Sequence, residues 1–286
     1  MIPKIKHSRA QLKSNLHYFE NGDIALYVSS DTYPDLFDFS FPSIRNKTSA
    51  KWTLVKYQKH LRFPQDSLTE DDINSIALWQ IKFKQYVLIE INNNIETHFN
   101  KEMDFCIALD YNFNEKMERT HYGKIEYRMK YKDDFTSFNE ISEALSDLFS
   151  YLPIYPKDKN TRKVVISSIP EKELKECFVN KLARRVAETH RLKYLPAYLN
   201  CDKKKLKNLP INEKISEWNR IYSDPNNVSL PEDIKGKTIV IIDDLYQSGI
   251  SMWSYAKYLK SKGAKYVLGM VCVKSLRDTD NKKHSL

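Results

Sequence analysis

The strongest constraint on the fold of this chain is an apolar run that leads directly into two acids and a short loop. Residues 238–242 read TIVII, Asp243 and Asp244 follow, and residues 245–251 read LYQSGIS. An unbroken apolar, β-branched run is typical of a strand that is buried on both faces, as in a parallel sheet. Ligands of open α/β sheets bind beyond the carboxyl ends of such strands. We therefore expect a binding site at this loop.

Strand-like and helix-like segments alternate from residue 105 onward. Apolar runs predict strands at residues 105–111, 164–166, 238–242 and 266–273. Helical spacing predicts helices at residues 138–152, beyond Pro170, and at 251–262, whereas 125–131 fits a helix or a strand. Alternation of this kind predicts an α/β fold, with a mainly parallel sheet flanked by helices over residues 105–286.

Residues 1–104 show no such rhythm, and we interpret them as an N-terminal α+β accessory region packed on the sheet. Residues 23–29 read as a strand. A hydroxyl at Ser67 and an acid at Glu70 have the form of a capping box, and helical spacing continues behind them to about residue 92. The aromatic residues of this region are interpreted as core and interdomain packing.

Composition excludes several classes of protein. The chain is 41% hydrophobic, which suffices for a buried core, yet no apolar run is long enough for a membrane span. Its N-terminus has no apolar stretch of the kind found in secretory signals. The four cysteines are far apart and contain no CxxC pair, and the seven histidines form no metal-binding pattern. We expect a cytoplasmic protein with reduced cysteines.

The loop after the two acids has the chemistry of a phosphate site. A helix N-terminus offers free backbone N–H groups and the positive end of a dipole, which favour an anion. Gly249 would let the backbone approach a phosphate, while Ser248 and Ser251 would add hydroxyl donors. Asp243 and Asp244 would then face sugar hydroxyls and Mg²⁺, which prefers carboxylate oxygens. The alternative is that the two acids only cap the following helix.

In this order, the residues from 238 to 251 resemble the signature of type I phosphoribosyltransferases, which bind 5-phosphoribosyl 1-pyrophosphate (PRPP). Within that family the chain looks most like the ComF-like, amidophosphoribosyltransferase-like branch. The resemblance covers about residues 105–274, and the segments 122–131, 164–170 and 209–219 support it by their order and spacing. It implies a PRPP-binding or nucleotide-binding protein that uses Mg²⁺ with PRPP.

The resemblance also implies roles for individual residues. Asp243 and Asp244 would be the catalytic pair and would hold Mg²⁺. Ser167 and Ser168 would form the pyrophosphate loop, and either Lys130 or a lysine among Lys203, Lys204, Lys205 and Lys207 would neutralise departing pyrophosphate. The residues implied to bind the 5′-phosphate are Tyr246, Gln247, Ser248, Gly249, Ile250 and Ser251.

Three departures from the family pattern leave two functions open. Gln247 stands where threonine is usual, the cysteine-rich zinc module is absent, and the arginine-rich stretch expected after Pro170 is replaced by Glu171, Lys172, Lys175 and Glu176. One hypothesis is an active phosphoribosyltransferase that transfers the phosphoribosyl group to a nitrogen acceptor and releases pyrophosphate. The other is a non-catalytic nucleotide sensor or assembly module of a nucleic-acid-associated bacterial competence or anti-phage defence system.

A nucleic acid is a candidate partner because the net charge is +9. The densest basic stretch, residues 201–220, would lie beside the ligand site. Basic and aromatic residues also alternate in the N-terminal region, at Arg45, Lys47, Lys51, Trp52, Lys56, Tyr57 and Lys59. The alternative is a generic basic surface with the aromatic side chains facing the core.

Overall fold

The computed structural model describes residues 15–28, 32–56, 58–89, 93–152, 163–172, 177–206 and 209–276. Its main feature is a six-stranded sheet in the order β5-β6-β12-β11-β7-β8. The strands are β5 (Val87–Ile89), β6 (Phe105–Tyr111), β7 (Val164–Ser168), β8 (Lys193–Leu195), β11 (Thr238–Tyr246) and β12 (Tyr266–Lys274). All neighbouring strands are parallel except β5, which runs antiparallel to β6 at one edge. The fold is therefore the α/β phosphoribosyltransferase-like sheet predicted from the alternation of strands and helices.

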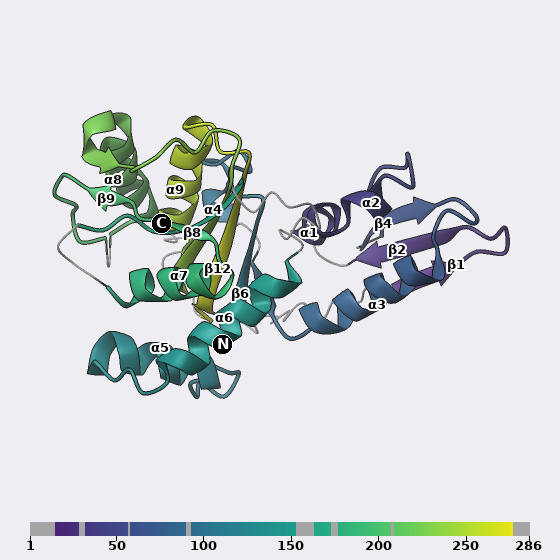
Figure 1. Cartoon of the computed structure of the whole chain (residues 1–286), viewed down its shortest axis with the longest axis horizontal. Helices are drawn as coiled ribbons and strands as arrows, with labels where there is room; N and C mark the ends of the chain where they lie inside the picture. The colour runs from purple at the N-terminus through teal and green to yellow at the C-terminus, as the bar shows by residue number, and fades with distance from the viewer. Residues whose placement is uncertain are drawn as a thin grey trace, which may run out of the picture.

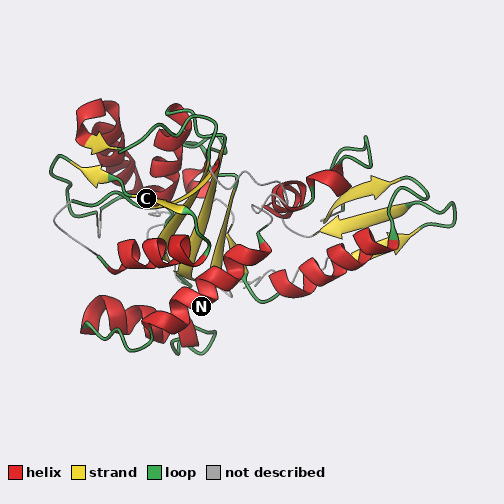
Figure 2. Ribbon diagram, viewed as in Figure 1, coloured by secondary structure: helices red, strands yellow, loops and turns green. Residues whose placement is uncertain are grey.

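Helices cover both faces of this sheet, as Figures 1 and 2 show. One face carries α5 (His121–Lys132), α6 (Phe138–Tyr151) and α7 (Phe178–Thr189). The other face carries α4 (Asn93–Glu96), α8 (Ile211–Ser223) and α9 (Ile250–Ser261). Short strands β9 (Tyr198–Leu199) and β10 (Val228–Ser229) pair beside α8. Because each strand of the sheet centre is apolar on both faces, it needs this cover on both sides.

The N-terminal residues form a separate antiparallel sheet in the order β1-β2-β4-β3, accompanied by three helices. Its strands are β1 (Asn15–Tyr18), β2 (Ile24–Val28), β3 (Thr53–Val55) and β4 (Gln58–Phe63). Its helices are α1 (Thr32–Ser40), α2 (Pro42–Arg45) and α3 (Glu70–Phe83). This is the α+β region predicted from the sequence.

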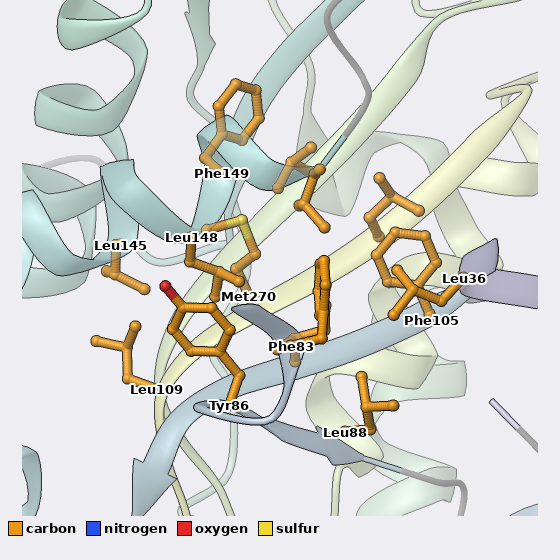
Figure 3. Close-up of a cluster of buried hydrophobic side chains, with 14 of the residues drawn as sticks. Leu36, Phe83, Tyr86, Leu88, Phe105, Leu109, Leu145, Leu148, Phe149 and Met270 are labelled. Carbon is orange, nitrogen blue, oxygen red and sulfur yellow. The ribbon is translucent and has the colours of Figure 1, made fainter. Parts of the chain in front are cut away.

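A continuous hydrophobic core joins the N-terminal region to the main sheet. Figure 3 shows Leu36 and Phe83 gathered with Phe105 and Met270 of the main sheet and with Phe149 of α6. The segment that follows α3 enters the main sheet as β5, so the sheet extends upstream of residue 105. The N-terminal region is thus attached through shared packing and through a strand of the main sheet. The division at residue 104 stays a prediction.

Two local predictions in the N-terminal region were wrong. The capping box is formed by Thr69 and Asp72, whose side chains exchange hydrogen bonds with each other's backbone N–H groups, and not by Ser67 and Glu70. Both pairs have the same spacing, so the pattern alone could not choose between them. The helix ends at Phe83 and does not run to residue 92, because residues 87–89 are drawn into the main sheet as β5. The ambiguous segment at 125–131 is helical, within α5.

Trp52 is half-buried and packs against the core. Its ring packs edge-on against Phe37 at a centroid distance of 5.8 Å, and its indole N–H donates to the Asp38 carboxylate at 2.9 Å. The Trp52 ring is thus engaged in packing within the N-terminal region, and Tyr57 lies outside the described residues. None of the helices in the described ranges is long and apolar enough to cross a bilayer.

Candidate functional site

The two acids lie inside β11 and not after it. The parallel pairing of β11 with β12 continues through Asp243 to Tyr246, which is opposite Lys274, so the strand is longer than the apolar run that predicted it. Neither acid caps the following helix, since the N-cap residue of α9 is Gly249 and no side chain bonds there. The alternative of a simple helix cap is therefore excluded.

The loop between β11 and α9 is held in one conformation by Gly249. Its φ is +81°, in the left-handed region, and a Cβ atom at this position would lie 2.1 Å from the hydroxyl oxygen of Tyr246. That hydroxyl accepts a hydrogen bond from the indole N–H of Trp253 in α9, at 2.9 Å. Glycine is thus required both by the positive φ and because the Tyr246 hydroxyl leaves no room for a Cβ atom. Tyr246, which is 3% exposed, supports the loop from beneath.

A cavity of about 310 Å³ opens at this loop. It brings together one of the acids, the loop, and two lysines from helices that are distant in sequence, Lys130 in α5 and Lys214 in α8. The full lining consists of Lys130, Tyr131, Leu206, Lys214, Asp243, Leu245, Tyr246, Gln247, Ser248, Gly249, Ile250, Ser251 and Met252. All six residues predicted to bind phosphate therefore line one cavity, and Leu206 and Lys214 of the basic stretch lie beside it as expected.

The acids are closely associated with Lys130. The Lys130 Nζ lies 2.6 Å from Asp244 Oδ2 and 3.9 Å from Oε1 of Glu126, one helical turn earlier in α5. Burial would lower the pKa of Lys130, but the attraction of Asp244, Asp243 and Glu126 outweighs it and raises that pKa. Burial and the neighbouring Asp244 carboxyl raise the pKa of Asp243.

Glu126 is a third carboxyl of this group and is 3% exposed. Burial, together with the charge of Asp244, raises its pKa to about 7. Its Oε1 has no hydrogen-bond partner within the described part of the chain. Four ionisable side chains therefore share a small volume at the end of β11, with acids in excess.

We expect Glu126→Gln to stabilise the protein in alkaline solution and to have little effect in acid. A carboxyl whose folded pKa is raised from 4.5 to about 7 binds its proton more tightly in the folded state. Its stabilising contribution is complete below pH 4.5 and is lost as pH rises through about 7. At about pH 8 the variant should gain roughly 2–3 kcal/mol of unfolding free energy. Urea denaturation at both ends of this range measures the effect, and an equal effect at both would contradict it.

Magnesium, which the resemblance implies, would need open oxygens on the two aspartates. Asp243 Oδ1 accepts the backbone N–H of Asp244 at 2.9 Å, and Asp244 Oδ2 holds the Lys130 ammonium. The carboxylates are of the right chemical type for the ion. As arranged, however, the Asp244 oxygen fits a divalent cation only if Lys130 moves away.

Ser167 and Ser168 lie inside strand β7, not in a loop. Their exposed fractions are 0% and 1%. The Ser167 hydroxyl donates to the Leu195 carbonyl at 2.9 Å and contacts the Tyr255 hydroxyl at 3.0 Å, and that of Ser168 donates to Asn180 at 2.8 Å. Both hydroxyls are thus used within the core, because a buried polar group requires a partner. Their predicted role with pyrophosphate finds no support in this geometry.

The lysine run is partly engaged with the fold. The Lys203 ammonium lies 3.5 Å from Glu171 and 5.0 Å from the centre of the Trp218 ring. Lys207, Lys175 and Glu176 lie outside the described residues. Trp218 is 1% exposed, stacks on Tyr222 at 5.2 Å, and donates its indole N–H to the hydroxyl of Ser251 at 3.2 Å. Through Trp218, α8 therefore holds the hydroxyl of Ser251 at the start of α9.

Sequence reasoning missed the roles of Lys214, Glu126 and Trp218. For Lys214 a signal was present: it shares the buried face of α8 with Trp218 and Ile221, where a lysine is unusual. Glu126 gave no such signal, since an acid four residues before a lysine is typical of an exposed helix pair. Its proximity to Asp244 arises only from the fold.

The parallel sheet, its helices and the cavity at the end of β11 define a phosphoribosyltransferase-like α/β protein. The model of the family described as "Phosphoribosyl transferase domain" matches residues 177–285. The match includes β11, the loop and α9. It does not include α5, which carries Lys130. A comparison with curated proteins finds no match.

Solved structures similar to this chain come from several organisms. Purine phosphoribosyltransferase from Pyrococcus horikoshii is 14% identical over 51% of this chain and 85% of its own, with a TM-score of 0.30. Adenine phosphoribosyltransferase from Leishmania tarentolae is 10% identical over 52% and 75%, with a TM-score of 0.33. Phosphoribosylpyrophosphate synthetase from Mycobacterium smegmatis is 14% identical over 47% of this chain, at a TM-score of 0.29, and the match spans 33% of its length.

Proposed function

We propose that the cavity at the end of β11 binds the phosphorylated ribose of PRPP or of a nucleotide. The observation that carries this proposal is the convergence of Lys130 and Lys214 on the loop from Tyr246 to Ser251, within one cavity. The loop supplies N–H groups at the start of a 12-residue helix, and the two lysines supply positive charge. Asp243 also lines this cavity, and Asp244 follows it in β11, so we infer that this acid pair would face the ribose hydroxyls.

In the catalytic form of this proposal, a nitrogen acceptor bonds to ribose C1 as the bond from C1 to the pyrophosphate oxygen breaks. Pyrophosphate leaves, and the acceptor's proton passes to solvent. The protein mainly orients PRPP and balances charge. The ComF-like branch and the identity of the acceptor belong to this proposal.

A second candidate is a non-catalytic nucleotide sensor or assembly module, within a bacterial competence or anti-phage defence system. Two observations favour it: the hydroxyls of Ser167 and Ser168 are used within the core, and Asp244 is paired with Lys130. Incubation with Mg-PRPP and a panel of nitrogen bases separates the two candidates. Pyrophosphate release supports transfer, and binding without release supports sensing.

We expect Gln247→Glu to weaken PRPP binding. Gln247 is exposed and lines the cavity, so the substitution places a negative charge beside the phosphate without disturbing the core. Repulsion at this range should reduce affinity roughly five- to tenfold. Calorimetry on the wild type and the variant measures the change. Gln65→Glu, the same substitution at an exposed position of the N-terminal region, is the matched control and should bind as the wild type does. Undetectable binding by the wild type at millimolar PRPP would overturn the proposal.

A further inference from the structure

Lys130 reaches the acids from a different element of the fold. It projects from α5, whereas Asp244 belongs to β11, and their charged atoms are 2.6 Å apart. The Asp244 side chain is 11% exposed and that of Glu126 is 4% exposed. The ammonium thus lies between two carboxyl groups that are largely withdrawn from water.

This ammonium has the electrostatic role that a bound cation would have. Carboxylates withdrawn from water are costly unless a positive charge compensates them. The Lys130 Nζ lies 2.6 Å from Asp244 Oδ2 and 3.9 Å from Glu126 Oε1, so one ammonium faces two carboxyl groups. Lys130 supplies the compensating charge from within the chain, at the Asp244 oxygen that a metal ion would otherwise occupy.

We propose that the Lys130 ammonium is a built-in counter-ion of the Asp243–Asp244 pair, so that the cavity binds a phosphorylated ribose without a divalent cation. The inference rests on the proposed function. The lysine also lines the cavity beside the phosphate loop, so its charge serves the ligand as well as the acids. Because the fold already holds Lys130 in place, ligand binding does not carry the free-energy cost of recruiting a separate ion.

Magnesium would compete with Lys130 for Asp244. An ion that binds Asp244 must first displace Lys130 and leave the ammonium without its partner. Magnesium should therefore change the affinity of the wild-type protein for ribose 5-phosphate very little. Removal of the Lys130 charge should make the affinity of this site for ribose 5-phosphate depend on Mg²⁺.

The test is calorimetry of ribose 5-phosphate and of PRPP binding to the full chain, in EDTA and in millimolar Mg²⁺. The wild type should bind with affinities that agree within about twofold in the two conditions. Lys130→Met should lose at least about tenfold in EDTA and recover most of it in Mg²⁺. Lys132→Met, the same change at an exposed position of α5, is the control and should behave as the wild type does.

Lys130→Arg keeps the charge and should keep binding without Mg²⁺, so the test survives if the methionine variant fails to fold. If the wild type binds the two ligands in Mg²⁺ but not in EDTA, this inference is overturned and the proposed function still stands. Equal affinity of Lys130→Met and the wild type in EDTA would also overturn it. No binding of either ligand in either condition would overturn the proposed function itself.

Discussion

Gly249→Ala should lower the free energy of unfolding by roughly 2–5 kcal/mol, because strain of the left-handed backbone adds to a steric clash. The new methyl group would lie 2.1 Å from the Tyr246 hydroxyl oxygen. Either the tyrosine or the loop must move, and the hydrogen bond from Trp253 is then lost. Since the loop carries the proposed phosphate contacts, PRPP binding should also be lost. Urea denaturation and calorimetry measure the two effects.

Gly236→Ala separates the two causes. Gly236 also has a positive φ, +72°, but a Cβ atom there would meet nothing within 4 Å. Only backbone strain remains, so this variant should lose about 1–2 kcal/mol and bind PRPP normally. Equal losses of stability in the two variants would show that the contact with Tyr246 does not constrain the loop.

Trp218→Ala should lower the free energy of unfolding by roughly 3–5 kcal/mol, which is usual for the loss of a large buried aromatic ring. The ring is 1% exposed and stacks on Tyr222, between α8 and the start of α9. Its removal would leave a cavity beneath the phosphate loop and leave the Ser251 hydroxyl without its donor. The affinity for PRPP should fall as well.

Trp218→Phe is the companion variant. It keeps an aromatic ring for stacking and removes the indole N–H that bonds to Ser251. Most of the stability should return, with a remaining loss of about 1–2 kcal/mol for the smaller ring and the lost hydrogen bond. If PRPP affinity nevertheless stays low, orientation of Ser251 is the cause. Full recovery of affinity would assign the alanine effect to packing alone.

The parts of the fold that the sequence predicted correctly are those with local signals. The strands that begin at Phe105, Val164, Thr238 and Tyr266 are apolar on both faces. Continuous apolar runs of this length are typical of strands buried on both faces of a parallel sheet. Strand β5 escaped prediction because Val87–Ile89 continues a helical pattern. Only pairing with β6, a long-range contact, determines its conformation.

The candidate site divides in the same way. The residues from Tyr246 to Ser251 line one cavity, and they could be grouped from the sequence because an acid pair, hydroxyls and a glycine lie within a few residues of each other. The resemblance implies a pyrophosphate loop at Ser167, but this residue lies in β7 and its hydroxyl donates to the carbonyl of Leu195, a partner 28 residues away. The pairing of Lys130 with Asp244 likewise depends on how α5 lies against the sheet. Contacts between residues so far apart in the sequence cannot be predicted from the local spacing of residue types.

The position of β12 in the sheet has a consequence for synthesis of the chain. This strand lies between β6 and β11, yet it follows both in the sequence, and Phe105 of β6 is paired with Leu268. A growing polypeptide therefore presents β6 well before its inner neighbour exists, whereas β1, β2 and β4 can pair early with nearby segments. Contacts between such distant segments form slowly and leave apolar edges open meanwhile. Exposure of these apolar edges to aggregation should thus end only when residues 266–274 pair between β6 and β11.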